Sequence, residues 1–91
     1  MENGPLSKDD ARDWAAVAFQ TGWFTFSEHC MDQLADRNMT EIDVQNTVQY
    51  GKCTEVQFDD GEWCYKIETK EMAVIVTFDA DELILVTAWR K

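Results

Sequence analysis

His29 and Arg37 are the two residues of this sequence best suited by type and spacing to do chemistry. The chain has a single histidine, and His29, Gln33 and Arg37 recur every four residues, so on a helix they form one stripe. Metal-free cleavage of RNA needs a proton-transfer group with a pKa near neutrality and a cation that stabilises the charged phosphorane. The stripe therefore indicates, if the protein is an enzyme, a metal-independent ribonuclease. Its candidate catalytic residues are His29, Arg37, Tyr65 and Arg90, with Lys66 as a further group of suitable type.

A structural role for the same residues is the alternative. At a helix N-terminus, His29 can donate to a backbone carbonyl or to Ser27, and Arg37 can pair with a nearby aspartate. A lone histidine without a second histidine or an obvious base favours this structural interpretation.

The charge of the chain argues in the same direction. It has 18 acidic and 8 basic residues, for a formal net charge of −10. A ribonuclease must bind a polyanion, which such a body repels, and binding of nucleic acid is therefore not expected. An acidic surface instead steers a protein toward a basic partner, although acidity can also serve solubility alone.

Metal and cofactor sites are not indicated. The three cysteines, Cys30, Cys53 and Cys64, show no C-x-x-C spacing, and we expect them to be reduced core residues. His29 and Cys30 are adjacent and would point about 100° apart on a helix, which disfavours zinc. The acidic runs at 59–60 and 79–82 predict solvated turns, since neither has the length or glycine placement of a calcium loop.

The size of the chain predicts one domain. Ninety-one residues suffice for a single core, so residues 1–91 should form one α+β domain. No run approaches the roughly 18 apolar residues of a membrane span, and the first ten residues are polar and acidic. We therefore expect a cytoplasmic protein without a membrane partner, and a homodimer is possible.

Helix signals fill the first half of the chain. A first helix over residues 7–20 should begin at Ser7, with Asp10 at its third position, and end at Gly22. Ser27 should cap a second helix that stops near Asn38. A third helix should run from its cap at residue 40, with an aspartate three residues on, to a terminating glycine at residue 51.

After residue 51 the apolar period changes from about 3.6 to 2, which indicates strands. Val56 and Phe58 alternate with polar residues, as do the apolar residues of 63–67, and the run 59–61 predicts a hairpin turn. Residues 72–78 and 83–89 are nearly continuously apolar and predict central strands. The expected fold is α+β, with two to three N-terminal helices packed on a four-stranded antiparallel meander.

An aromatic group surrounds the end of the first helix. It is expected to fill the seam between that helix and the sheet, while an exposed patch for a partner is the alternative, because tryptophan is enriched in binding hot spots. Its members are Trp14, Trp23, Phe24 and Phe26.

Residues 26–51 resemble a family of small bacterial domains of unknown function, itself related to the BrnT and RelE toxin superfamily. The usual pattern is Ser-x-His, a seven-residue gap and Arg-Gly-Ile-Ser, followed by an Asp-Val helix that ends in Gly. Here the gap from His29 to Arg37 matches, whereas Asn38 replaces the Gly and Met39-Thr40 replaces Ile-Ser. The strands around 63–67 and 84–87 also resemble those of the family, so 24–91 is the family-like region and 7–20 an additional helix.

The resemblance implies a BrnT/RelE-like fold, and its toxin relatives are ribonucleases only by analogy of fold. Combined with the charge, it favours an acidic protein-binding domain that contacts a basic protein in a toxin–antitoxin, toxin–immunity or mobile-element system. The metal-independent ribonuclease that uses His29 and Arg37 is the rival hypothesis. A third is a non-catalytic domain that oligomerises through its sheet edge.

Overall fold

The computed structural model describes residues 5–80 and 82–91. In this part of the chain the helices precede most of the strands, and the predicted α+β class is confirmed. None of these helices is long and apolar enough to cross a membrane. The elements are α1 (Lys8–Thr21), β1 (Phe24–Phe26), α2 (Glu28–Asp36), α3 (Glu41–Tyr50), β2 (Lys52–Asp59), β3 (Glu62–Glu68), β4 (Met72–Asp79) and β5 (Glu82–Arg90).

The predicted hydroxyl caps begin all three helices. The Oγ of Ser7 and the Oγ of Ser27 each accept a hydrogen bond from the backbone N–H three residues on, at 3.1 and 3.0 Å. Thr40 and Asp43 form a reciprocal capping box, with N–H to side-chain oxygen distances of 2.9 and 3.2 Å. Each cap satisfies an N–H that the first turn of a helix leaves unpaired, which fixes where these helices start.

The helix ends are also where the sequence predicts them, but for two different reasons. Gly22 and Asn38 have φ values of 85° and 56°, in the left-handed region that stops a helix. Gly51 instead has an extended backbone, with φ −90° and ψ −173°. A Cβ at Gly51 would lie 2.5 Å from the Thr47 carbonyl oxygen and 2.6 Å from that of Glu68. Gly51 therefore ends α3 as predicted, but close backbone approach, and not a left-handed turn, is the reason that this position requires glycine.

The sheet has five strands in the order β1-β5-β4-β3-β2. Strands β2 to β5 form the predicted antiparallel meander, and β1 adds a parallel strand with Phe24 opposite Leu83 and Phe26 opposite Leu85. The prediction of a four-stranded, wholly antiparallel sheet was therefore wrong. A three-residue strand shows too little alternation to be seen in a sequence, and parallel pairing joins segments that lie far apart in the chain.

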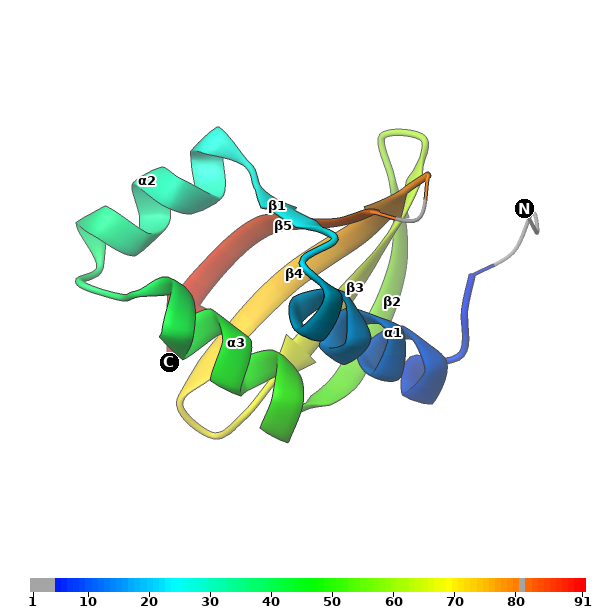
Figure 1. Cartoon of the computed structure of the whole chain (residues 1–91), viewed down its shortest axis with the longest axis horizontal. Coiled ribbons are helices and arrows are strands. Elements are labelled where there is room, and N and C mark those ends of the chain that lie inside the picture. The colour runs from blue at the N-terminus through cyan, green and yellow to red at the C-terminus, as the bar shows by residue number, and fades with distance from the viewer. Residues whose placement is uncertain (1–4, 81) are drawn as a thin grey trace.

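The three helices lie on one face of the sheet (Figure 1). Helix α1 packs on β2, α3 on β4 and β3, and α2 on β5. The core between the layers consists of small side chains from α1, such as Ala11 and Ala15, and of larger apolar side chains from the sheet and the other two helices. Its largest fully buried side chains are Ile67, Leu83, Leu85, Val44, Val48, Val74 and Val76.

Two hairpin turns lie at the same end of the sheet, because alternate turns of a meander fall on the same side. In the turn between β2 and β3, Asp60 and Gly61 have φ values of 53° and 82°, which confirms the predicted hairpin. In the turn between β4 and β5, Ala80 also has a positive φ, of 49°. Asp81 of this turn lies outside the described residues. We call this end of the sheet, which carries both turns, the hairpin end.

Candidate functional site

The predicted stripe of His29, Gln33 and Arg37 lies on the solvent-facing side of α2. The Nε of Arg37 donates to Oε1 of Gln33 at 2.7 Å, and Nε2 of Gln33 lies 3.5 Å from Nε2 of His29. His29 and Arg37 are both exposed. Gln33 therefore links the imidazole and the guanidinium, and the guanidinium pairs with this amide where an aspartate was considered.

Tyr65 lies in the core, away from this stripe. Its side chain is 2% exposed, and its hydroxyl accepts a hydrogen bond from the Leu6 N–H at 3.0 Å. Its ring makes an edge contact with Phe78, with centroids 5.7 Å apart. These contacts give Tyr65 a packing role between β3 and the segment that leads into α1.

Arg90 lies near the opposite end of the sheet from the two hairpin turns. Its guanidinium donates to the Asn38 carbonyl at 3.3 Å and lies 3.7 Å from the Asp43 carboxylate. Its register partner on β4 is four residues from that of Tyr65, or about 13 Å along the strand. The structure thus brings His29 and Arg37 together through Gln33, places Arg90 against the loop after α2, and leaves Tyr65 apart.

Ser27, the serine of the Ser-x-His pattern, joins α2 to the sheet. Besides capping the helix, its Oγ donates to the Val86 carbonyl at 2.9 Å, and its own N–H donates to the Leu85 carbonyl at 3.0 Å. In the pairing of β4 with β5, Ile75 lies opposite Thr87 and Val76 lies opposite Leu85, so the register is irregular here and Val86 has no partner residue on β4. Ser27 therefore supplies a partner to a carbonyl at this irregularity, a role that no local sequence rule predicts.

The cysteines have different surroundings. Cys30 and Cys53 are buried as predicted, and burial raises the pKa of the Cys30 thiol to about 11 and raises that of Cys53 as well. Cys64 is only half-buried, because it lies on the sheet face away from the helices, opposite Thr77. Among residues 5–80 and 82–91, no three histidine, cysteine or acidic side chains come together to form a metal site.

Acidic side chains gather at the hairpin end. The β2–β3 hairpin supplies three carboxylates, at the last residue of β2, in the turn and at the first residue of β3, and the last residue of β4 and the first residue of β5 supply two more. In the described part of the chain none of the five is in an ion pair, whereas the ion pairs found there involve other carboxylates. The five residues are Asp59, Asp60, Glu62, Asp79 and Glu82.

Basic side chains gather at the other end of the sheet, where β2 begins, β3 turns into β4 and β5 finishes. There Arg90 pairs with Asp43, and Lys91 with Glu68. Four of the eight basic residues of the chain lie at this end, namely Lys52, Lys70, Arg90 and Lys91. The basic residues are therefore concentrated at this end of the sheet, whereas the five carboxylates of the hairpin end have no ion-pair partner among the described residues. Exposed carboxylates elsewhere, such as Asp32 and Asp36 on α2, are also in no ion pair there.

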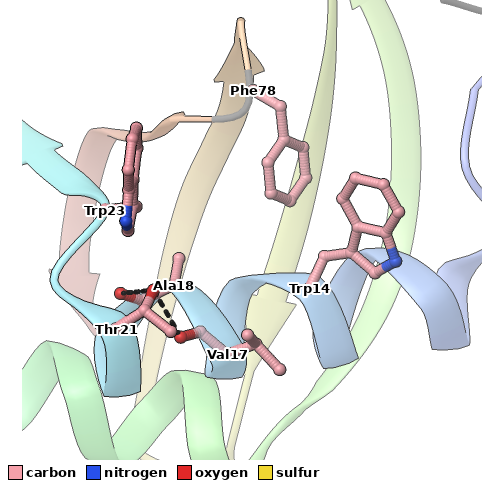
Figure 2. Close-up of a pocket in the computed structure, with 6 residues that line it drawn as sticks. All are labelled: Trp14, Val17, Ala18, Thr21, Trp23 and Phe78. Atoms are coloured by element: carbon pink, nitrogen blue, oxygen red, sulfur yellow. Dashed lines mark hydrogen bonds between the residues drawn. The ribbon is translucent and has the colours of Figure 1, made fainter.

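An apolar groove opens beside the hairpin end, between α1 and the start of the turn after β4 (Figure 2). Its volume is about 410 Å³. The rings of Trp23 and Phe78 stand on either side of the opening above α1, and the Trp14 ring makes an edge contact with Phe78 at 6.2 Å. The hydroxyl of Thr21 bonds backbone carbonyls of its own helix, so this polar group is already satisfied. The lining residues are Trp14, Val17, Ala18, Thr21, Trp23 and Phe78.

The aromatic residues predicted to fill one seam therefore divide into two groups. Phe24 and Phe26 do fill it, with ring centroids 4.5 and 6.3 Å from Phe19. Trp14 and Trp23 do not, since they are 53% and 62% exposed in the groove. The spacing of Trp14, Val17 and Thr21 along α1 could have indicated this second stripe, but only the fold adds its other wall.

Comparison with known proteins gives one family match. Residues 26–90 match the family described as Domain of unknown function (DUF4258). No curated protein and no solved structure gives a significant match. The matched segment contains α2, α3 and β2 to β5, while α1 and Trp23 lie outside it. Because the match covers more than half of the chain, this protein belongs to the DUF4258 family.

Proposed function

We propose that this protein is an acidic protein-binding domain of BrnT/RelE-like type, which contacts a basic protein in a bacterial toxin–antitoxin, toxin–immunity or mobile-element system. The resemblance of residues 26–51 to that superfamily supplies the setting. The observation that carries the proposal is the group of five carboxylates at the hairpin end, none of them in an ion pair within the described residues.

Carboxylates without neighbouring cations project a negative field from one end of the molecule. Such a field attracts a positively charged partner and orients its approach, which raises the association rate. Where Lys91 or Arg90 pairs with a carboxylate, the field is partly cancelled. The two ends of the sheet therefore differ in what they attract, and the hairpin end is the one suited to a basic protein.

Affinity capture from the native host, followed by binding kinetics at several salt concentrations, tests the proposal. We expect a stoichiometric basic partner whose association slows as salt rises, because screening shortens the range of the field. A captured partner that is acidic, or whose association is insensitive to salt, would contradict the proposal.

Matched charge variants make the test specific to the hairpin end. A triple variant with Asp60→Asn, Glu62→Gln and Asp79→Asn changes the net charge from −10 to −10 + 3 = −7. The control triple makes the same change in net charge at exposed sites elsewhere, with Asp32→Asn, Asp36→Asn and Glu71→Gln. We expect association to slow roughly tenfold in the first variant and far less in the second. Equal slowing would mean that overall charge alone drives binding.

The metal-independent ribonuclease remains the second proposal, and one observation favours it: His29 and Arg37 are both exposed and are linked through Gln33. On this hypothesis, inducing the wild-type gene in a bacterial host arrests growth and degrades RNA, and His29→Ala relieves both effects. Asp36→Asn, on the same helix, is the control that should leave the arrest intact. A harmless wild type that cleaves no RNA would exclude the enzyme.

A further inference from the structure

We propose that the groove between α1 and the β4–β5 hairpin binds one large apolar side chain, aromatic or branched aliphatic, from a partner segment that carries lysine or arginine beside it. This inference rests on the proposed function and names the part of the surface that the basic partner would occupy. Three features of the groove support it: its exposed apolar lining, its acidic border and its position in the chain.

The groove exposes three large apolar side chains. Trp14 and Val17 are each 53% exposed and Trp23 is 62% exposed, and all three line the same opening. Contiguous apolar surface of this kind on a soluble domain marks a binding surface, and tryptophan is enriched among the residues that dominate binding energy. A volume of about 410 Å³ is within the range of pockets that enclose a ligand group.

The groove is open where Trp23 and Phe78 face one another, and α1 closes its lower side (Figure 2). The Leu83 N–H donates to the Trp23 carbonyl at 3.0 Å, which ties this wall to β5. An inserted side chain would therefore contact a ring on each side and the small Ala18 below. Such a site buries an apolar side chain with little rearrangement, because two of its walls belong to α1 and β4 and the third, Trp23, is hydrogen-bonded to β5.

An acidic residue borders the groove at one end of its α1 wall. Asp10 lies one helical turn before Trp14, on the same side of α1, and in the described part of the chain its carboxylate is in no ion pair. Asp79 follows Phe78 in β4, so its side chain points to the other face of the sheet. Lysine or arginine beside the inserted side chain would pair with Asp10, as the polar rim of an interface does around its apolar centre.

Neither cation of α1 forms an ion pair with Asp10 among the described residues. Lys8 is in no ion pair there, and Arg12 pairs with Asp13 at 3.0 Å. The other terminal nitrogen of Arg12 donates to the Gln49 carbonyl at the end of α3. The guanidinium is therefore held between α1 and α3, and the Asp10 carboxylate is left without an ion-pair partner.

The charge also decides between possible occupants. A second copy of this chain would bring two acidic borders together, and each copy carries a net charge of −10, so repulsion opposes a dimer through this end. A neutral apolar ligand would gain nothing from the border. A cationic protein segment uses both features, and it is the occupant to which the observations point.

Five of the six lining residues lie outside the segment that matches the family, and only Phe78 lies inside it. The groove is therefore built by α1 and Trp23 against the family domain. The choice of apolar side chain is accordingly a property of this chain, added to whatever the family region does.

Nuclear magnetic resonance titration with short peptides tests the proposal. The first peptide has a central phenylalanine between lysines, the second replaces the phenylalanine with alanine, and the third keeps the phenylalanine between glutamates. The chain has four tryptophans, whose indole N–H signals can be assigned with single Trp→Phe variants. We expect the first peptide to shift the signals of Trp14 and Trp23. The signal of Trp89, which lies beside Lys66 on the opposite face of the sheet, should not move.

Variants of the groove give the quantitative test. Trp23→Ala and Val17→Gln change exposed side chains, so the fold should be kept, and thermal unfolding checks this. We expect each to weaken binding of the first peptide at least tenfold, as truncation of a central binding residue does. Trp89→Ala is the control and should leave the affinity unchanged.

The outcomes separate this inference from the proposed function. If the alanine peptide binds as tightly as the phenylalanine peptide, attraction between charges stands and the groove is not the anchor site. If the glutamate peptide binds as tightly, the cationic part of the proposal is wrong. A dimer in sedimentation that Trp23→Ala dissociates would assign the groove to a second copy. If no peptide binds and a captured basic partner binds Trp23→Ala as tightly as wild type, the inference is overturned while the proposed function survives.

Discussion

Replacing Gly51 with alanine should destabilise the protein strongly, for a steric reason that is independent of its backbone angles. The added Cβ would lie 2.5 Å from the Thr47 carbonyl oxygen and 2.6 Å from that of Glu68. Both are backbone atoms held in place: the Thr47 carbonyl accepts the Gly51 N–H at 2.8 Å, and Glu68 is paired with Lys52 between β3 and β2. Relief therefore requires α3 or the sheet to move.

The size of the effect follows from the distances. Real Cβ atoms essentially never come within 3.0 Å of such neighbours, so the backbone would have to shift by at least 3.0 − 2.5 = 0.5 Å. Overpacking of this kind costs up to about 3 kcal/mol. For a domain of this length, a loss of about 3 kcal/mol lowers the midpoint of thermal unfolding by about 12–24 °C.

Gly61→Ala is the matched control. Gly61 has φ +82° with nothing within 4 Å of an added Cβ. Its alanine variant is therefore destabilised only by the left-handed backbone conformation, which costs about 1 kcal/mol. The midpoint should then fall by only about 4–8 °C. Both midpoints can be measured by circular dichroism during heating. If Gly51→Ala unfolds at the same temperature as Gly61→Ala or above it, the steric explanation is refuted.

Three further predictions concern the caps, the acid response and the thiols. Ser7→Ala removes one cap, which is worth about 1 kcal/mol of unfolding free energy. Ser27→Ala should lower the unfolding free energy about twice as much, because the hydroxyl of Ser27 both caps α2 and donates to a carbonyl of β5. Urea unfolding of both variants checks this. The side chains of Lys91 and Thr54 donate hydrogen bonds to Glu68 and lower the pKa of its carboxyl group. Glu68→Gln should therefore destabilise the protein at neutral pH, and the difference in unfolding free energy from wild type should disappear as pH falls through that lowered pKa. Unfolding at several pH values tests the sign. Iodoacetamide should modify Cys64 before Cys30, since burial raises the pKa of the Cys30 thiol to about 11 and closes access to it; mass spectrometry of the partly labelled native protein gives the order.

The sequence could predict those parts of the fold that depend on neighbouring residues. Ser7, Ser27 and Thr40 cap helices because each cap bond spans three residues. The turn at Asp60 and Gly61 follows in the same way from residues that accept positive φ values. The stripe of α2 could also be predicted from the sequence, because helical geometry alone aligns residues four apart.

Features that depend on distant segments were missed or assigned a wrong cause. Residues 24–26 become a strand only because β5 offers them a free edge. Gly51 is required by the approach of Glu68, which lies in another element. The groove forms only where α1, Trp23 and Phe78 come together. The carboxylates of the hairpin end come from two hairpins that only the alternation of the meander places at the same end of the sheet. Composition recorded how many carboxylates there are, but not where they gather.

The pairing of β1 with β5 bears on the order in which the chain folds. Phe24 lies opposite Leu83, a separation of 83 − 24 = 59 residues, whereas β2 to β5 are successive neighbours in the sheet. Contacts between distant residues form slowly, because a long loop must close first. We therefore expect β2 to β5 to form early and β1, with α1, to dock last. The groove is completed only by that final step, so its amide hydrogens should exchange with solvent sooner than those of the meander, and a bound partner segment would slow that exchange.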